Sequence, residues 1–139
     1  AMKKLFYGIC LVFVLSGPIW ALDAGGIQVD VLAKSDLSWE GSPLPSYTTA
    51  TPEITILRIK IPPGMQLPLH EHPVINAGVL LRGELTVITE QNEILYLKAG
   101  DAIVEVVDKW HYGRNDGNEP AEIIVFYAGG REQPITIKR

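Results

Sequence analysis

Cysteine is almost absent from this chain of 139 residues: the single one, Cys10, lies in an apolar run near the start. A lone cysteine forms no disulfide framework, and with that run removed the chain would offer no thiol nucleophile and no thiolate ligand. Excess positive charge is also absent, with 12 basic against 16 acidic residues and a net charge of -4. An acidic surface repels phosphate backbones, so we expect no nucleic-acid partner.

Several common functional patterns are missing as well. After residue 25 no stretch keeps a 3.6-residue apolar period, which predicts little helix in that part of the chain. The sequence contains no phosphate-binding loop, no Gly-x-Ser-x-Gly turn and no carboxylate pair at a catalytic spacing. The sequence alone therefore leaves the catalytic residues unknown.

Residues 1–21 have the layout of an export signal. Ala1 precedes Met2 and is interpreted as a cloning remnant, and two lysines are followed by the apolar run Leu5–Leu15. Ser16-Gly17-Pro18 ends the run, and Ala21 offers a small residue for cleavage. We expect a signal peptide, helical in form, and a periplasmic or secreted protein of the bacterial envelope. An uncleaved membrane anchor is the alternative, and only then would the membrane be a partner.

Residues 22–139 are predicted to form one all-β domain. The 13 glycines and 10 prolines divide the chain into short apolar segments, as in a sandwich or barrel. The segment 34–52 is interpreted as a packed loop. Strands are expected at 27–33, 53–61, 74–81, 84–90, 94–97, 102–107, 110–114, 121–127 and 135–137, with 74–81 and 84–90 paired around Arg82-Gly83.

The chain has three histidines, and their spacing favours a metal site. His70 and His72 are separated by one residue, so in extended chain both imidazoles point to the same side while Glu71 points away. His111 lies in a later predicted strand. Neutral imidazole is the commonest ligand of zinc, iron, nickel and copper in proteins. His70 and His72 are therefore candidate ligands of one ion, although histidine pairs also occur by chance on protein surfaces.

Two blocks around these histidines have characteristic spacings. They read Gly64-x5-His70-x-His72-x3-Asn76-x6-Gly83 and Gly100-x5-Val106-x-Asp108-x2-His111-x3-Asn115. They resemble the two sequence motifs of the cupin superfamily, over roughly residues 54–127. The resemblance, to a small single-domain cupin with a conserved barrel, implies a double-stranded β-helix, which is a jelly-roll barrel. It also implies that the three histidines bind a metal inside that barrel.

The chain departs from the family pattern at Asn76, where many cupins have a glutamate ligand. A neutral amide is a weaker ligand than a carboxylate, so Asn76 is interpreted as a weak fourth ligand, a water holder, or a residue that orients a histidine. Three neutral histidines leave the full charge of a divalent ion in place, which favours an anionic ligand or a metal-bound water of lowered pKa. Zinc, iron, manganese, nickel and copper all remain open. Val106 and Asp108 replace a proline and a glycine of the second motif.

Other polar residues are weaker candidates. Tyr96, Glu105 and Arg114 are placed at the rim of the pocket, as acid, base or anion anchor. Trp110 and Tyr112 flank His111, and strand alternation points them away from the metal.

Two functions remain open at this stage. One is a metal-dependent enzyme on a small molecule, of the dioxygenase, isomerase, lyase or hydrolase type, and the other is a non-catalytic protein that binds a metal or small ligand. A Glu or Tyr near the open metal position would favour the enzyme, and a purely aliphatic cavity would favour the binder. The segment 121–127 is apolar on both faces, which predicts a homodimer.

Overall fold

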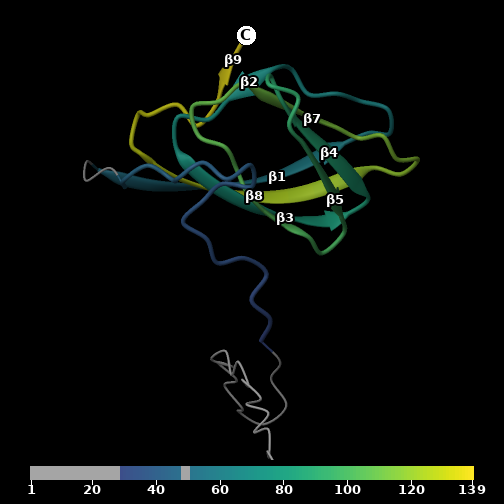
Figure 1. The fold of residues 1–139 in the computed structure, drawn as a ribbon, viewed down its shortest axis with the longest axis horizontal. Helices are drawn as coiled ribbons and strands as arrows, with labels where there is room; N and C mark the ends of the chain where they lie inside the picture. The colour runs from purple at the N-terminus through teal and green to yellow at the C-terminus, as the bar shows by residue number, and fades with distance from the viewer. Residues whose placement is uncertain (1–28, 48–50) are drawn as a thin grey trace, which may run out of the picture. The chain divides into compact units, whose positions relative to one another are not determined.

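The computed structural model describes residues 29–47 and 51–139. Residues 31–139 form one compact unit, which is all-β where it is described. The unit begins with an irregular segment and continues through nine strands (Figure 1). The strands are β1 (Pro52–Ile61), β2 (His70–Glu71), β3 (Ile75–Arg82), β4 (Glu84–Thr89), β5 (Ile94–Lys98), β6 (Ala102–Val104), β7 (His111–Arg114), β8 (Ala121–Gly130) and β9 (Ile137–Lys138).

The strands form two antiparallel sheets that face each other. One sheet has the order β1-β8-β3-β6 and the other has the order β5-β4-β7-β2-β9. In Figure 1, β1, β8 and β3 lie in one layer, and β2, β7 and β4 lie in the facing layer. The predicted all-β fold, a double-stranded β-helix, is confirmed.

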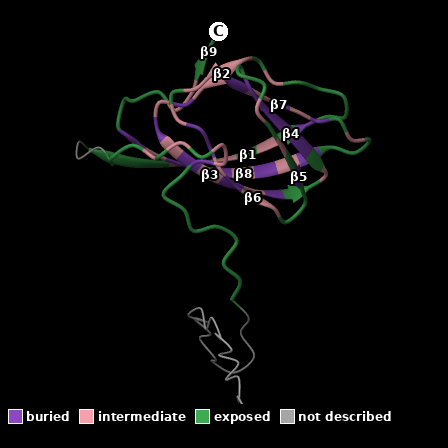
Figure 2. Cartoon of the chain, viewed as in Figure 1, coloured by how far each residue is buried: buried purple, intermediate pink, exposed green. Residues whose placement is uncertain are grey.

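The core lies between the two layers because inward positions carry apolar side chains. Along β8, Ala121, Ile123, Val125 and Tyr127 are buried, while the residues between them are less so. Figure 2 shows the buried stretches running along the central strands, with the loops mostly exposed. This alternation with a period of two is what one buried sheet face requires.

The predicted hairpin around Arg82-Gly83 is wrong. β3 pairs with β6 and β8, whereas β4 pairs with β5 and β7, so the chain passes from one sheet to the other at Gly83. Gly83 has φ of +75°, and a Cβ there would lie 2.7 Å from the carbonyl oxygen of Pro120. Only glycine fits so close to a neighbouring backbone in this conformation, so a glycine is required where the chain crosses between the sheets.

The strand expected at 27–33 is not formed by its described residues. Residues 29–33 are irregular and exposed, and residues 27–28 lie outside the described residues. Alternating side chains make a strand only where a hydrogen-bonded neighbour is available. Among the other segments the main differences are small: β2 was not expected, and β6 ends at Val104 rather than at 107.

The loop before β1 packs against the barrel, as expected. The backbone N–H of Trp39 donates to the carbonyl of Val104 at 2.9 Å, and its side chain packs on the core. Glu40 pairs with Lys109 at 2.8 Å, which ties this loop to the turn before β7.

The predicted signal peptide or anchor, residues 1–21, lies outside the described residues. Within the part of the chain that is described, no helix is long and apolar enough to cross a membrane.

Candidate metal centre

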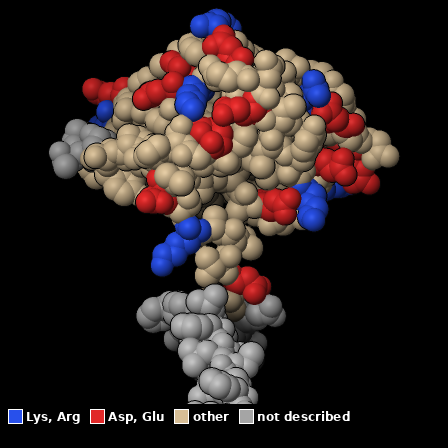
Figure 3. Space-filling view, viewed as in Figure 1, with Lys and Arg blue, Asp and Glu red and all other residues tan. Residues whose placement is uncertain are grey.

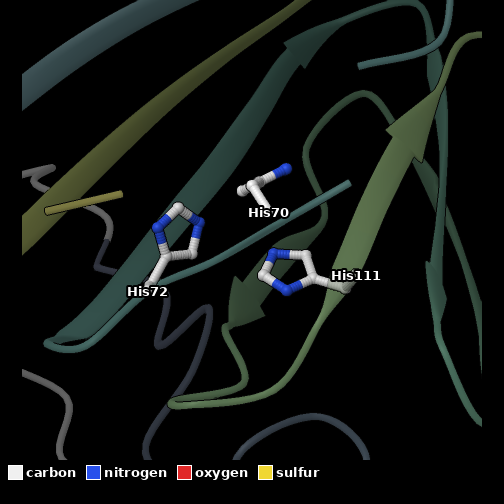
Figure 4. A group of neighbouring side chains, drawn as sticks. All are labelled: His70, His72 and His111. Carbon is white, nitrogen blue, oxygen red and sulfur yellow. The ribbon is translucent and has the colours of Figure 1, made fainter. Parts of the chain in front are cut away.

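The three histidines converge inside the barrel. His70 of β2 lies directly opposite His111 of β7 in the antiparallel register, and His72 follows two residues after His70. Their ligand nitrogens all lie within 4.8 Å of one another (Figure 4). A cross-strand pair and an i, i+2 pair thus bring together side chains that are about forty residues apart in the sequence.

The hydrogen bonds of the imidazoles leave one nitrogen of each ring free. Nδ1 of His70 lies 2.7 Å from the carbonyl oxygen of Pro68, Nδ1 of His72 2.7 Å from that of Ile135, and Nδ1 of His111 2.8 Å from that of Lys109. A carbonyl accepts only, so each Nδ1 carries the proton and each Nε2 keeps its lone pair. Fixing the tautomer in this way is what metal-binding histidines require.

Burial keeps the imidazoles neutral. His72 and His111 are 4% and 2% exposed, and His70 is half-buried. Desolvation lowers the pKa of His72 from 6.5 to about 3, and it also lowers the pKa of His70 and of His111. Three lone pairs are therefore available at neutral pH, and the residues fit a divalent transition metal.

The histidines line a cavity of about 50 Å³ inside the barrel. That space is enough for a few water-sized groups. The rest of its wall consists of aliphatic side chains and four other residues: Asn76, Glu105, Gly113 and Tyr127.

Glu105 lies closer to the histidines than a rim residue would. It follows β6, is 9% exposed, and its Oε1 is 3.8 Å from Nε2 of His111. The indole N–H of Trp39 donates to the same Oε1 at 3.1 Å, and so does the backbone N–H of Val106 at 3.2 Å. Burial raises the pKa of Glu105.

Asn76 and Tyr127 also reach the cavity. Asn76 is 2% exposed, and its Nδ2 donates to the carbonyl of Val74 at 3.3 Å. The ring of Tyr127 lies 5.3 Å from that of His72, centroid to centroid, and burial raises the pKa of Tyr127 to about 12. Tyr127 was not among the residues expected at the site, although the alternation along β8 places it on the inner face.

Tyr96 and Arg114 do not line this cavity. Both lie opposite Thr86 in the second sheet, and neighbouring Leu85 and Val87 are the ones that face the cavity. Side chains alternate along a strand, so Tyr96 and Arg114 lie on the outer face. There Arg114 donates to Asp116 at 2.6 Å.

A family model described as "Cupin domain" matches residues 57–127, about half of the chain. The protein belongs to the cupin domain family. The match begins within β1 and ends within β8, so it includes all three histidines and Glu105. A comparison with curated proteins found no match.

Solved structures similar to this cupin include several enzymes. An oxalate oxidase in complex with the substrate analogue glycolate is 25% identical, with a TM-score of 0.52 over 61% of this chain and 45% of the other. A dimethylsulfoniopropionate (DMSP) lyase, DddQ from Ruegeria pomeroyi, is 23% identical, with a TM-score of 0.54 over 71% and 47%. A Klebsiella pneumoniae protein with a double-stranded β-helix domain is 21% identical, with a TM-score of 0.54 over 69% and 80%. This cupin spans less than half the length of the two enzymes.

Proposed function

We propose that this cupin is a metal-dependent enzyme that acts on a small molecule, of the dioxygenase, isomerase, lyase or hydrolase type. The supporting observation is the arrangement of His70, His72 and His111, whose Nδ1 atoms are all bonded to backbone carbonyls. This arrangement supports one ion held by three Nε2 atoms. Such an ion would polarise a bound oxygen atom or lower the pKa of a bound water.

The wall of the cavity favours an enzyme over a metal carrier. A carboxyl group and a phenol, on Glu105 and Tyr127, line the same cavity as the histidines. Both are groups that bind or move protons in active sites. The alternative of a non-catalytic binding protein would be better supported by walls that are aliphatic throughout.

The size and charge of the cavity favour a small polar or anionic ligand. A volume of about 50 Å³ admits a metal ion with a molecule of few heavy atoms. The ion would carry more positive charge than the protein groups around it neutralise, which attracts an anion. The similar oxalate oxidase was solved with glycolate, a small carboxylate.

Elemental analysis tests the metal directly. The untagged protein, purified without added metal, should contain close to one equivalent of a single transition metal, because three imidazoles on one ion bind tightly. The same preparation would then be assayed with small carboxylates, with the chelated protein as the control. A content below about a tenth of an equivalent, not restored by dialysis against zinc, iron or manganese, would refute the proposal.

We also propose that the chain is exported to the periplasm or beyond. The basic start followed by an apolar run supports this proposal.

The charged side chains of the surface show no large patch of one sign in the view of Figure 3, where acidic and basic side chains are interspersed.

A homodimer is proposed from the outer face of the β1-β8-β3-β6 sheet. Ile54, Ile56 and Phe126 are 64%, 56% and 50% exposed, and Ile56 lies opposite Phe126 in the register. A sheet face in contact with water normally carries polar residues, and an exposed apolar group of this kind is typical of an interface. We propose that a second copy of the chain covers it.

Light scattering should give the barrel protein a mass of twice that of the chain at micromolar concentration. Phe126→Glu is expected to give the monomer, because a charge cannot be buried cheaply in an apolar interface. Tyr96→Glu is the matched control, since Tyr96 is 73% exposed on the other sheet. A monomeric parent protein would contradict the proposal.

A further inference from the structure

Glu105 is a buried carboxyl group beside the three histidines. It is 9% exposed, and within the described residues its close basic neighbour is the imidazole of His111, at 3.8 Å. The nearby Lys109 is engaged elsewhere, at 2.8 Å from Glu40 and 2.9 Å from the hydroxyl of Ser42. Burying an ionised carboxylate is strongly unfavourable unless a positive charge lies beside it. A metal ion held by the neighbouring histidines would supply such a charge beside Glu105.

The distances allow Glu105 to bind that ion. Oε1 of Glu105 is 3.8 Å from Nε2 of His111. Two ligand atoms that each lie about 2.0–2.2 Å from one ion are at most about 4.4 Å apart. The observed separation is below that limit, so the carboxylate of Glu105 and the imidazole of His111 are close enough to contact one ion.

Two N–H groups that do not belong to the histidine cluster hold the carboxylate of Glu105 in place. Trp39, from the loop before β1, donates its indole N–H to Oε1 at 3.1 Å, and the backbone N–H of Val106 donates at 3.2 Å. Among the described residues, no donor reaches the second oxygen, Oε2. Two N–H groups thus fix the carboxylate beside the histidines, and the lone pairs of its other oxygen, Oε2, stay available to an ion.

We propose that Glu105 is the fourth, anionic protein ligand of the metal, and that Trp39 is its positioning residue. This inference rests on the proposed metal centre and adds a negative charge to it. Asn76 lines the same cavity, but a neutral amide is a weaker ligand than a carboxylate. The ligand set is then three imidazoles and one carboxylate, supplied by the chain just after β6.

Cobalt(II) is a suitable probe because its visible absorption changes with the ligand set. The metal-free protein would be titrated with cobalt(II), and affinities measured by competition with a chelator. Glu105→Gln keeps the shape of the side chain and removes its charge, and it should weaken binding by about 10–100-fold or more and change the absorption bands. Trp39→Phe keeps an aromatic ring and removes one hydrogen bond, and it should weaken binding by about three- to tenfold.

Glu122→Gln is the matched control, because it makes the same chemical change on β8, where Glu122 pairs with Arg58 and Lys60. Its cobalt affinity and spectrum should equal those of the parent. If the parent binds cobalt and Glu105→Gln binds it with the same affinity and spectrum, the role of Glu105 is refuted while the metal centre stands. If the parent binds no cobalt, both fail. Should Glu105→Gln not fold, unchanged affinity in folded Trp39→Phe overturns the inference.

Discussion

His111→Ala is expected to abolish stoichiometric metal binding. His111 is 2% exposed and lies opposite His70 across the β2–β7 pair. Its Nδ1–H donates to the backbone carbonyl oxygen of Lys109. Residues that only support metal ligands are worth about 10–100-fold in affinity, so losing a ligand itself should cost at least about 100-fold. Bound metal should fall from one equivalent to a small fraction in elemental analysis.

Thermal unfolding gives a second measurement of the same effect. A metal present at about 100 times its Kd stabilises the protein that binds it by about 2.7 kcal/mol, which raises Tm by several degrees. The parent protein should show this rise and His111→Ala should not. Because removal of a buried ring also weakens the fold, each protein is compared with its own metal-free form.

Tyr112→Ala is the control for this experiment. Tyr112 is adjacent to His111 on β7 and lies on the other face of the strand. It should keep the metal and the metal-dependent rise in Tm. Equal metal content in His111→Ala and in the parent would show that the ion, if present, is bound elsewhere.

The metal-free protein should lose stability steeply on acidification from pH 6.5. The folded-state pKa of His72 is about 3, against 6.5 for the ordinary side chain. Below pH 6.5 the unfolded chain takes up a proton that the folded protein does not, so each further pH unit favours unfolding by about 1.4 kcal/mol for this residue. Between pH 7.5 and 4.5 His72 alone accounts for about 2.7 kcal/mol, and stabilities of whole domains are about 5–15 kcal/mol.

Three other buried groups also change how the stability depends on pH. The pKa values of His70 and His111 are also lowered by burial, and they add to the loss. The pKa of Glu105 is raised by burial, so the folded protein takes up that proton first and part of the loss is offset.

Urea unfolding of chelator-treated protein at pH 7.5 and 4.5 measures the effect. His72→Gln lacks the titrating ring, so its free energy of unfolding should fall less between the two pH values than that of the parent. The comparison is needed because other carboxylates also contribute to acid unfolding. The same fall in both proteins would refute a neutral, buried His72.

The sequence predicted local features well and connections between distant segments poorly. Period-two alternation is a property of each strand alone, so β1, β5 and β8 were found close to their observed bounds. Strand pairing depends on two segments at once. Gly83 lies against the backbone of Pro120, and the strands on its two sides belong to different sheets, so the hairpin expected there was wrong. The segment 29–33 has the pattern of a strand but is irregular in the structure.

At the site, too, some features were predicted from the sequence and others were visible only in the tertiary structure. Residue type, the i, i+2 geometry and the resemblance to the cupin motifs together singled out His70, His72 and His111, and the structure brings the three together. Glu105, Tyr96 and Arg114 were equivalent candidates in the sequence, and only the packing of the two sheets separated them. Glu105 faces the cavity, whereas Tyr96 and Arg114 face outward.

The sequence by itself thus determined that the chain is all-β and that His70 and His72 share one face of an extended segment, because side chains alternate along a strand, and its resemblance to the cupin motifs placed the three histidines inside a barrel. The tertiary structure decided that each histidine donates Nδ1 to a backbone carbonyl and that a buried carboxylate lies beside them. These contacts join residues as far apart as Trp39 and Glu105, or His72 and Ile135. Their separation in the sequence carries no signal of their proximity, which exists only once the two sheets pack face to face.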